Sequence, residues 1–383
     1  FRGTEEYLRL SELKAAGKKV YDFSVGEPDF NTPQHICDAA SRAMAAGHTH
    51  YTASGGIQEL RLAVAKQYQA RHGLEYAPAQ IVVSNGAKHS LHNAFTVLCD
   101  PGDEVIIPAP YWVSYAELVK LTGAKPVIVS TEESNDFKLT PEQLRAAITP
   151  RTKVLLLCSP SNPTGSMYSP EDLGALADVV LEKNLVVISD EIYERLIYGD
   201  NKFASFATVR PGLAERTITI NGVSKAYAMT GWRIGWTLAP MAISKAMDSL
   251  QSQETSNPSS VSQYAALAAL EGSQQCVDDM LKHFAERREY VRRRISELPK
   301  LSCPNMGGAF YAFINIQAHL GRDYAGVRVN NSADWCLTLL AQQGVATVMG
   351  SAFGAEGYAR LSFATNLETL AKGFEGIDAF LKS

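Results

Sequence analysis

The chain has 383 residues, of which 46% are hydrophobic and 20% are charged, and its net charge is −4. This balance is that of an ordinary globular protein, long enough for two domains or for one large domain with an appendage. No apolar run reaches the length of a membrane span. The arginine-rich stretch from Arg287 to Arg294 lies among glutamates and indicates a solvated helix face, so neither nucleic acid nor a membrane is an expected partner.

The six cysteines are scattered and none forms a Cys-x-x-Cys pair, which predicts a reducing compartment. We therefore expect a cytoplasmic protein. Because the chain begins at Phe1 rather than Met, a plastid protein whose targeting peptide has been removed is the alternative. No metal site is predicted, because the closely spaced histidines lack a matching set of acidic residues or cysteines. These histidines are His48, His50, His89 and His92.

Seven short apolar runs recur between Ile81 and Leu238. Because most are apolar throughout rather than alternating, they are typical of strands buried on both faces. Helical patterns separate most of them, which indicates a mostly parallel sheet covered on both sides. The link between the last two runs is too short to ensure a crossover helix, so one strand could be antiparallel. The runs are residues 81–83, 104–107, 126–129, 154–157, 185–188, 217–220 and 234–238, and the intervening helical patterns include 91–98, 115–121, 141–148 and 170–181.

The pattern changes after Gln251. One long amphipathic stretch is followed by short strand-like pieces and a closing helix, which predicts a smaller α+β domain. The stretch covers residues 261–298, the strand-like pieces 309–316, 345–349 and 358–363, and the helix 367–381. We predict an N-terminal arm with part of the small domain over residues 1–35, a large domain over 36–275 and a small C-terminal domain over 276–383.

Polar residues follow several of the apolar runs directly, where ligands collect in open parallel sheets. Gly86, Ala87 and Lys88 come after the first run and open a helix, whose free N–H groups and positive dipole end favour a phosphate. Asn162 follows the fourth run, in a turn rich in proline and glycine. Asp190 ends the fifth run, and a carboxylate buried there needs a cationic partner such as a pyridinium N–H.

Lys225 lies where the sixth run gives way to a loop. A partly desolvated amine has a lowered pKa and is nucleophilic. With Ser224 before it and Arg233 eight residues later, it forms a set that can make an imine and hold a phosphate, which suggests pyridoxal phosphate. Trp112 offers a flat ring that could stack on such a cofactor. Taken alone, each of these candidate site residues is also explained as an ordinary loop, turn or core residue. Several consecutive strands that deliver suitable groups argue for a site.

Three motifs carry a family resemblance. They are Ser-Lys-x4-Thr-Gly-x-Arg-x-Gly over residues 224–235, Asn-Pro-Thr-Gly over 162–165 and Asp-Glu-x-Tyr over 190–193. Over essentially its whole length the chain resembles the class I/II aminotransferases, fold-type I enzymes that use pyridoxal 5′-phosphate. Segments 26–30, 84–88 and 110–115 resemble the bacterial and plastid aspartate aminotransferases, a branch that includes prephenate aminotransferases. The resemblance implies an α/β/α large domain around a mostly parallel seven-stranded sheet, with a smaller α+β domain.

The resemblance also implies residue roles. Lys225 binds the cofactor covalently and acts as general acid–base, Asp190 pairs with the pyridine nitrogen, and Tyr193 hydrogen-bonds the phenolic oxygen. A homodimer with shared sites is implied, because Tyr51 reaches the phosphate from the partner subunit. The cofactor site comprises Gly86, Ala87, Lys88, Trp112, Asn162, Asp190, Tyr193, Ser224, Lys225 and Arg233. The substrate site comprises Gly26, Lys88, Trp112, Asn162 and Arg360, of which Arg360 clamps the α-carboxylate.

The implied reaction is ping-pong transfer of an amino group between aspartate and 2-oxoglutarate. The alternative is amination of prephenate to arogenate by glutamate or aspartate, since Lys88 can reach a second carboxylate in either case. A pyridoxal-phosphate lyase or synthase is a further reading. A ligand-sensing domain of a regulator is disfavoured by the retained Lys225 and by the short stretch before Gly26. Residues 1–6 do not resemble the usual polar, proline-containing arm of this branch, which leaves substrate preference open.

Overall fold

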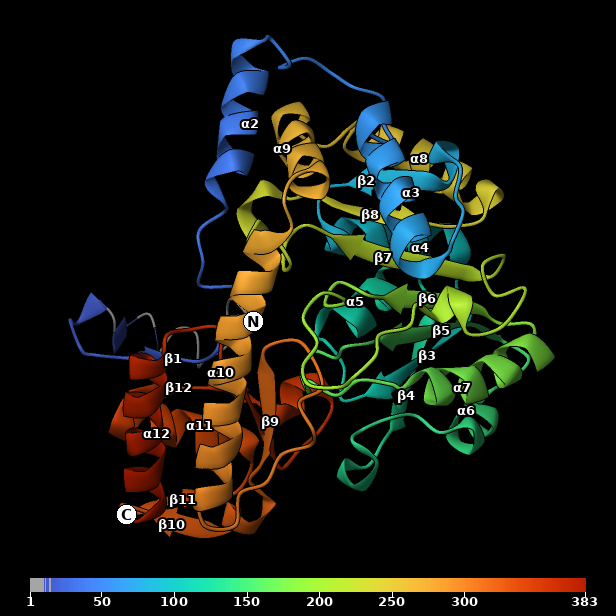
Figure 1. The fold of residues 1–383 in the computed structure, drawn as a ribbon. Helices are drawn as coiled ribbons and strands as arrows, with labels where there is room; N and C mark the ends of the chain where they lie inside the picture. Colours follow the sequence, from blue (N-terminus) through green and yellow to red (C-terminus); the bar gives the residue numbers. More distant parts are fainter. Residues whose placement is uncertain (1–9, 11, 14) are drawn as a thin grey trace.

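The computed structural model describes residues 10, 12, 13 and 15–383 of the chain (Figure 1). Residues 1–6, whose departure from the usual arm bears on substrate preference, lie outside the described residues. The described elements form two groups. One is built around a large sheet, and the other around small sheets near the C-terminus (Figure 1).

All seven apolar runs belong to one sheet, which confirms the predicted α/β fold. The strand order is β2-β8-β7-β6-β5-β3-β4. Strand β8 is antiparallel to both of its neighbours, and every other pairing in the sheet is parallel. The antiparallel strand is one of the two whose short connection left that orientation open. The strands are β2 (Ile81–Ser84), β3 (Glu104–Ala109), β4 (Lys125–Ser130), β5 (Thr152–Cys158), β6 (Val186–Asp190), β7 (Thr217–Gly222) and β8 (Gly235–Leu238).

Both faces of this sheet are covered, which explains its continuous apolar runs. In β5, Val154 and Leu156 pack into one core cluster, while Leu155 and Leu157 pack into another on the opposite face. Each fully buried aliphatic side chain of this kind contributes roughly 2 kcal/mol of hydrophobic stabilisation. The helices around the sheet are α2 (Gln34–Ala45), α3 (Gln58–His72), α4 (Ala87–Leu98), α5 (Ser114–Leu121), α6 (Pro141–Ala147), α7 (Pro170–Glu182), α8 (Met241–Glu254) and α9 (Ser260–Glu271).

The second group contains a three-stranded antiparallel sheet, β13-β14-β9, and two two-stranded sheets. Strand β1 pairs in parallel with β12, so the N-terminal segment packs with the C-terminal part of the chain. The domain boundaries at residues 35 and 275 stay a prediction. The elements are β1 (Tyr21–Asp22), α10 (Gln275–Glu297), β9 (Tyr311–Asn315), β10 (Arg322–Tyr324), β11 (Val327–Val329), α11 (Ser332–Gln343), β12 (Val345–Ala346), β13 (Val348–Met349), β14 (Tyr358–Ser362) and α12 (Leu367–Leu381).

Two stretches that were predicted as continuous elements are each divided in the structure, so the prediction was wrong for both. The amphipathic stretch 261–298 is broken between α9 and α10, because Gly272 takes an extended conformation and ends α9. The strand-like piece 345–349 is two strands in different sheets, since β12 pairs with β1 whereas β13 pairs with β14. Short 3₁₀ helices lie in the connections: η1 (Pro78–Gln80), η2 (Glu133–Asn135), η3 (Phe206–Thr208), η4 (Thr230–Trp232), η5 (Gln317–His319) and η6 (Gly350–Phe353).

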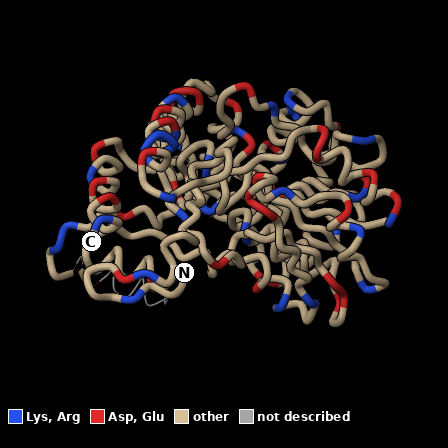
Figure 2. The backbone as a smooth tube through the Cα atoms, turned by 90° about the horizontal axis from the view of Figure 1, so that it is seen from below, with Lys and Arg blue, Asp and Glu red and all other residues tan. Residues whose placement is uncertain are grey.

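Charged residues of both signs are interspersed over the backbone rather than gathered on one face (Figure 2). On α10, Arg292 pairs with Glu289 and Arg294 pairs with Glu297, as expected for a solvated helix face. Arg287 departs from that expectation, because it is buried and pairs with Asp29 through both nitrogens, at 2.6 and 3.0 Å. Among the described helices, none combines the length and apolarity needed to cross a membrane.

Candidate active site

A cavity of about 670 Å³ lies beyond the carboxyl ends of the sheet strands. Its walls also include residues of the second group, so both parts of the fold contribute to it. The structure places most of the predicted site residues on this cavity; Gly86 and Tyr51 are not among its lining residues. The predicted residues that line it are Gly26, Ala87, Lys88, Trp112, Asn162, Asp190, Tyr193, Ser224, Lys225, Arg233 and Arg360.

The Lys225 amine lies in the cavity and donates a hydrogen bond of 2.6 Å to the Gly26 carbonyl. Burial, together with the positive charges of Arg360 and Arg233, lowers the pKa of Lys225 to about 8, against the opposing effects of Glu27 and Asp190. A substantial fraction of this amine is therefore neutral near pH 8, as a nucleophile or a base requires. The buried amine that follows β7 agrees with the activated lysine that the sequence predicts.

Asp190 ends β6 and is 3% exposed. Its carboxylate accepts hydrogen bonds from the Tyr115 hydroxyl at 2.7 Å and from the Ile192 N–H at 3.2 Å. Burial raises the pKa of Asp190, and these two donors oppose that rise. Within the part of the chain that the structure describes, no cation forms an ion pair with it. A cationic ring nitrogen in the cavity would supply the missing partner.

The start of α4 forms an anion seat. Gly86 precedes the helix at φ +86°, and the first N–H groups, at Ala87 and Lys88, have no partner within the helix. Arg233, held in a left-handed conformation at φ +56°, lies so close that a Cβ at Gly86 would collide with its guanidinium. A Cβ at Gly235 would collide with the backbone at Ala87. The two glycines therefore let Arg233 and the end of β8 come close to the start of α4, where the helix dipole favours a phosphate.

Arg360 on β14 is 6% exposed and lines the cavity. It donates to the Asn162 side-chain carbonyl and to the Ser24 carbonyl, both at 2.8 Å. Its Nε is buried without a hydrogen-bond partner, and among the described residues no carboxylate pairs with it. A buried guanidinium bound only to neutral acceptors leaves room for an external carboxylate. The Tyr311 ring lies beneath it, 4.6 Å from the guanidinium carbon.

A second cation lies on the same cavity. The Lys88 amine is 4.8 Å from the centre of the Trp112 ring, which also packs edge-to-face on Tyr115. Burial lowers the pKa of Lys88, and the nearby charge of Arg233 lowers it further. Among the described residues, no carboxylate pairs with Lys88. Besides Lys225 and Arg233, the cavity therefore holds two further cations, Arg360 and Lys88, that lack an anionic partner among the described residues.

Tyr51 lies elsewhere. Its side chain is 89% exposed, and it is not among the residues that line the cavity of its own chain. Exposed apolar side chains that include Val25 and Met44 occur on the same chain. A large aromatic residue with this exposure is consistent with a role on another subunit, and its place in the site stays a prediction.

Some residues of the site were missed by sequence reasoning. Tyr115 donates to Asp190, and the Tyr311 hydroxyl is 2.8 Å from that of Tyr193. Glu27 lines the cavity, accepts a hydrogen bond of 2.6 Å from Thr230 and raises the pKa of Lys225. Tyr115 and Glu27 lie within motifs that carried the family resemblance. Tyr311 gives no local signal, because only the packing of β9 brings it to the site.

The residues present fit pyridoxal 5′-phosphate. The glycine-lined start of α4 with Arg233 and Ser224 suits a phosphate, the uncompensated Asp190 suits a protonated pyridine nitrogen, and Lys225 suits an aldehyde. The cavity also provides Trp112 as a flat surface beside the ring position. The same set of groups would not be needed for a ligand without an anionic tail and a cationic ring nitrogen.

Known proteins similar to this chain agree with this assignment. Residues 18–377 match the family described as "Aminotransferase class I and II". The chain is 49% identical to the aspartate aminotransferase of Geobacillus stearothermophilus, over 98% of this chain and 94% of that protein. It is 47% identical to an aspartate/prephenate aminotransferase of Cereibacter sphaeroides, over 97% of this chain and 94% of that protein.

A crystal structure of the aspartate aminotransferase from Rhizobium meliloti superposes with a TM-score of 0.96 at 43% identity, covering 99% of this chain and 95% of that one. The match confirms the three-layer fold with its mostly parallel seven-stranded sheet. The family match covers nearly the whole chain, and the site holds the groups that the family's cofactor needs. The chain therefore belongs to the class I and II aminotransferases, enzymes that use pyridoxal 5′-phosphate.

Proposed function

We propose that this aminotransferase transfers the amino group between aspartate and 2-oxoglutarate in a ping-pong reaction. The observation that carries the proposal is the pair of cations without anionic partners, Arg360 and Lys88, on one cavity. A dicarboxylate substrate supplies one carboxylate to each. A monocarboxylic amino acid would leave Lys88 without a partner in a partly desolvated site, which is unfavourable.

The side chains have distinct tasks in this reaction. Bound pyridoxal phosphate supplies an electron sink for the negative charge left when the α-proton of the amino acid is removed. Arg360 orients the α-carboxylate through its planar fork. Lys225, with its lowered pKa, takes the α-proton and returns it to the cofactor side as general base and acid. Asp190 holds its negative charge beside the ring nitrogen, and Tyr115 donates to that charge.

The substrate assignment is tested with Lys88→Ala. We expect kcat/KM for aspartate to fall by roughly 10- to 100-fold, because a charge-assisted contact worth about 1.5–3 kcal/mol is lost. Activity with alanine should change by less than about threefold, because alanine has no second carboxylate to lose a contact. Steady-state kinetics with both amino donors measures the difference. The matched control is Lys245→Ala, which removes an exposed lysine of α8. Equal losses for aspartate and alanine would contradict the proposal.

Prephenate is a second candidate amino acceptor. It also carries two carboxylates, and the cavity has apolar walls, including Val25, Val113 and Phe353, that suit a six-membered carbon ring. The similarity to aspartate/prephenate aminotransferases supports testing it. The test measures product formation from prephenate with aspartate or glutamate as amino donor and compares it with product formation from 2-oxoglutarate. Turnover of both acceptors would show that the enzyme has both activities. No turnover of prephenate at saturating donor would remove this candidate.

We also propose a homodimer in which Tyr51 completes the partner's phosphate site. The exposure of Tyr51 supports this arrangement. Mixing Lys225→Ala with Tyr51→Ala subunits, after dissociation and reassembly, would give hybrid dimers with one native site each. Because half of randomly exchanged dimers are hybrids, activity should reach about a quarter of the wild-type value. Activity no greater than that of the two parent variants would contradict a shared site, as would a fully active monomer in sedimentation.

A further inference from the structure

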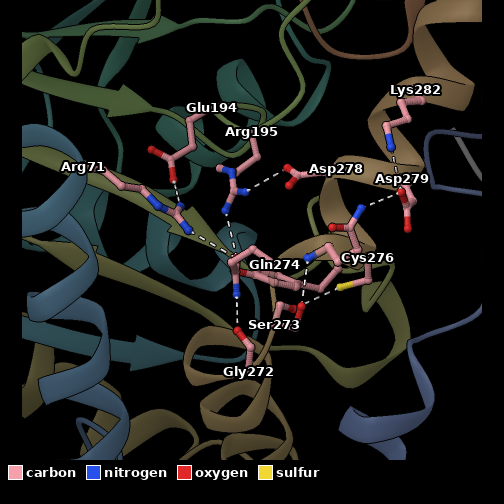
Figure 3. Close-up of polar contacts among 12 residues, drawn as sticks. Arg71, Glu194, Arg195, Gly272, Ser273, Gln274, Cys276, Asp278, Asp279 and Lys282 are labelled. Carbon is pink, nitrogen blue, oxygen red and sulfur yellow. Dashed lines mark hydrogen bonds and ion pairs between the residues drawn. The ribbon is translucent and has the colours of Figure 1, made fainter.

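The Gln274 side chain forms a polar hub that is not part of the lining of the cofactor cavity. It lies at the junction between α9 and α10 (Figure 3). Its side-chain oxygen accepts hydrogen bonds from Arg195 at 3.0 Å, from the Tyr227 hydroxyl at 2.8 Å and from Arg71 at 3.4 Å. Figure 3 shows the side chains of Arg71 and Arg195 converging on this one amide group.

The hub is anchored to the helix pair. The Gln274 side-chain nitrogen donates to the carbonyls of Ala269 and Gly272, both at 3.0 Å, at the end of α9. Both halves of the amide are therefore used, and its orientation is fixed by partners of opposite type. A side chain that makes five hydrogen bonds to four segments of chain behaves as a rigid support rather than as a solvated glutamine.

Two of the three donors lie two residues from groups of the active site. Arg195 lies two residues after Tyr193, and Tyr227 lies two residues after Lys225. At this separation a shift of the donor side chain moves the backbone that carries the site group. Tyr227 is 3% exposed and Gln274 is half-buried, so the hydrogen bond between them is partly shielded from solvent, and the loss of a partner there is costly.

A second contact reinforces the same segment. Glu194, the residue after Tyr193, pairs with Arg71 at 3.2 Å and with His72 at 2.8 Å, both at the end of α3. Arg71 thus bridges Glu194 and Gln274 through its two terminal nitrogens. The loop of Lys225 and the segment of Tyr193 are therefore tied to the same amide, while Lys225 and Tyr193 themselves line the cavity.

We propose that Gln274 is a positioning residue that fixes the Lys225 amine relative to the Tyr193 hydroxyl. The proposal rests on the proposed role of Lys225 as the residue that binds the cofactor. In the structure the amine is 6.0 Å from the centre of the Tyr193 ring. Loosening the hub lets the Lys225 loop move away from Arg233 and Arg360, the cations that disfavour its protonated form.

The first test is Tyr227→Phe in the holoenzyme, which removes one hydroxyl and keeps the ring. The readout is the pH midpoint of the visible absorbance of the bound cofactor, which reports protonation at the Lys225 nitrogen. We expect the midpoint to rise by roughly half a unit, since a hydrogen bond of modest net strength is lost. The kcat for aspartate should fall by roughly threefold or more while KM stays within about twofold.

Tyr324→Phe is the matched control. Tyr324 is also buried, and its hydroxyl also makes one side-chain hydrogen bond, of 2.6 Å to His319. It belongs to β10, its ring stacks on Phe380 of α12, and it is not among the residues that line the cofactor cavity. We expect a comparable loss in thermal stability for the two variants and an absorbance midpoint within about 0.1 unit of wild type for the control. A midpoint shift that is equal in the two variants would overturn the proposal.

Gln274→Met provides a second variant that keeps the length and removes every hydrogen bond of the hub. We expect a midpoint shift in the same direction and at least as large as that of Tyr227→Phe. The double variant should then show no added effect from Tyr227→Phe, because the two groups act through one contact. Additive shifts, or an unmoved midpoint in a folded Gln274→Met enzyme, would overturn the proposal. If the wild type itself showed no pH-dependent band, the proposed role of Lys225 would fail instead.

Discussion

The lowered pKa of Lys225 makes a quantitative prediction about stability. In the cofactor-free protein, the folded state holds the protonated amine in a partly desolvated cavity. Its pKa falls to about 8 there, against about 10.4 for an unfolded chain. Below pH 8 both states are protonated, and the folded state bears the full cost of holding the charge. As pH rises from 8 towards 10.4 the folded state loses its proton first, so this destabilisation disappears.

The substitution Lys225→Met keeps the approximate length of the side chain and removes its charge. The pKa difference corresponds to about 3 kcal/mol at pH 7 and about 1 kcal/mol at pH 9.5. These are upper values, because the side chain keeps some contact with solvent. We therefore expect the cofactor-free variant to be more stable than wild type at pH 7, with the advantage shrinking by up to about 2 kcal/mol at pH 9.5.

Urea unfolding of both proteins at several pH values between 7 and 9.5 measures this difference, since titrations common to both cancel. Lys245→Met is the control, because it makes the same substitution at an exposed lysine of α8 that does not line the cavity. If the difference in free energy of unfolding between wild type and Lys225→Met stayed constant within about 0.5 kcal/mol over this range, desolvation of the Lys225 charge would not be the cause.

Three further substitutions test the site and its frame. Asp190→Asn should lower kcat by roughly 10²- to 10³-fold even at saturating cofactor, because a buried charge partner is worth about 3–5 kcal/mol; a loss below tenfold would contradict the assigned role. Arg360→Lys should raise KM by roughly 30-fold for aspartate and alanine alike, because the bidentate clamp on the α-carboxylate is lost. Arg287→Ala should lower the free energy of unfolding by about 2 kcal/mol in urea titrations, since Asp29 loses its two-pronged partner.

Much of the fold could be read from local pattern. Continuous apolar runs located all seven strands, because a strand buried on both faces needs apolar side chains on both faces. The same pattern misjudged residues 261–298, where amphipathicity continues across Gly272 while the backbone does not remain helical. Periodicity reports which faces are apolar, and it does not report a change of direction made by one extended residue.

The chemical groups at the strand ends could be predicted from the order of the residues alone. Asp190, Asn162 and Lys225 follow buried strands, and parallel strands deliver their ends to one edge, so these residues were found before any contact was known. Their meeting with Arg360 could not be derived from pattern, because β14 lies in the other group of elements. The family resemblance supplied that residue, and the tertiary structure supplies the geometry.

The hydrogen-bond partners of the site residues follow from the packing of the chain. Tyr115 donates to Asp190 and the Tyr311 hydroxyl meets that of Tyr193, although 75 and 118 residues separate the partners along the chain. Gln274 joins loops from three parts of the sequence in the same way. A hydrogen bond depends on distance and direction in space, and a residue's type and local pattern encode neither. The cofactor can therefore be predicted from the sequence, whereas the hydrogen bonds that position Lys225 can be found only in the folded structure.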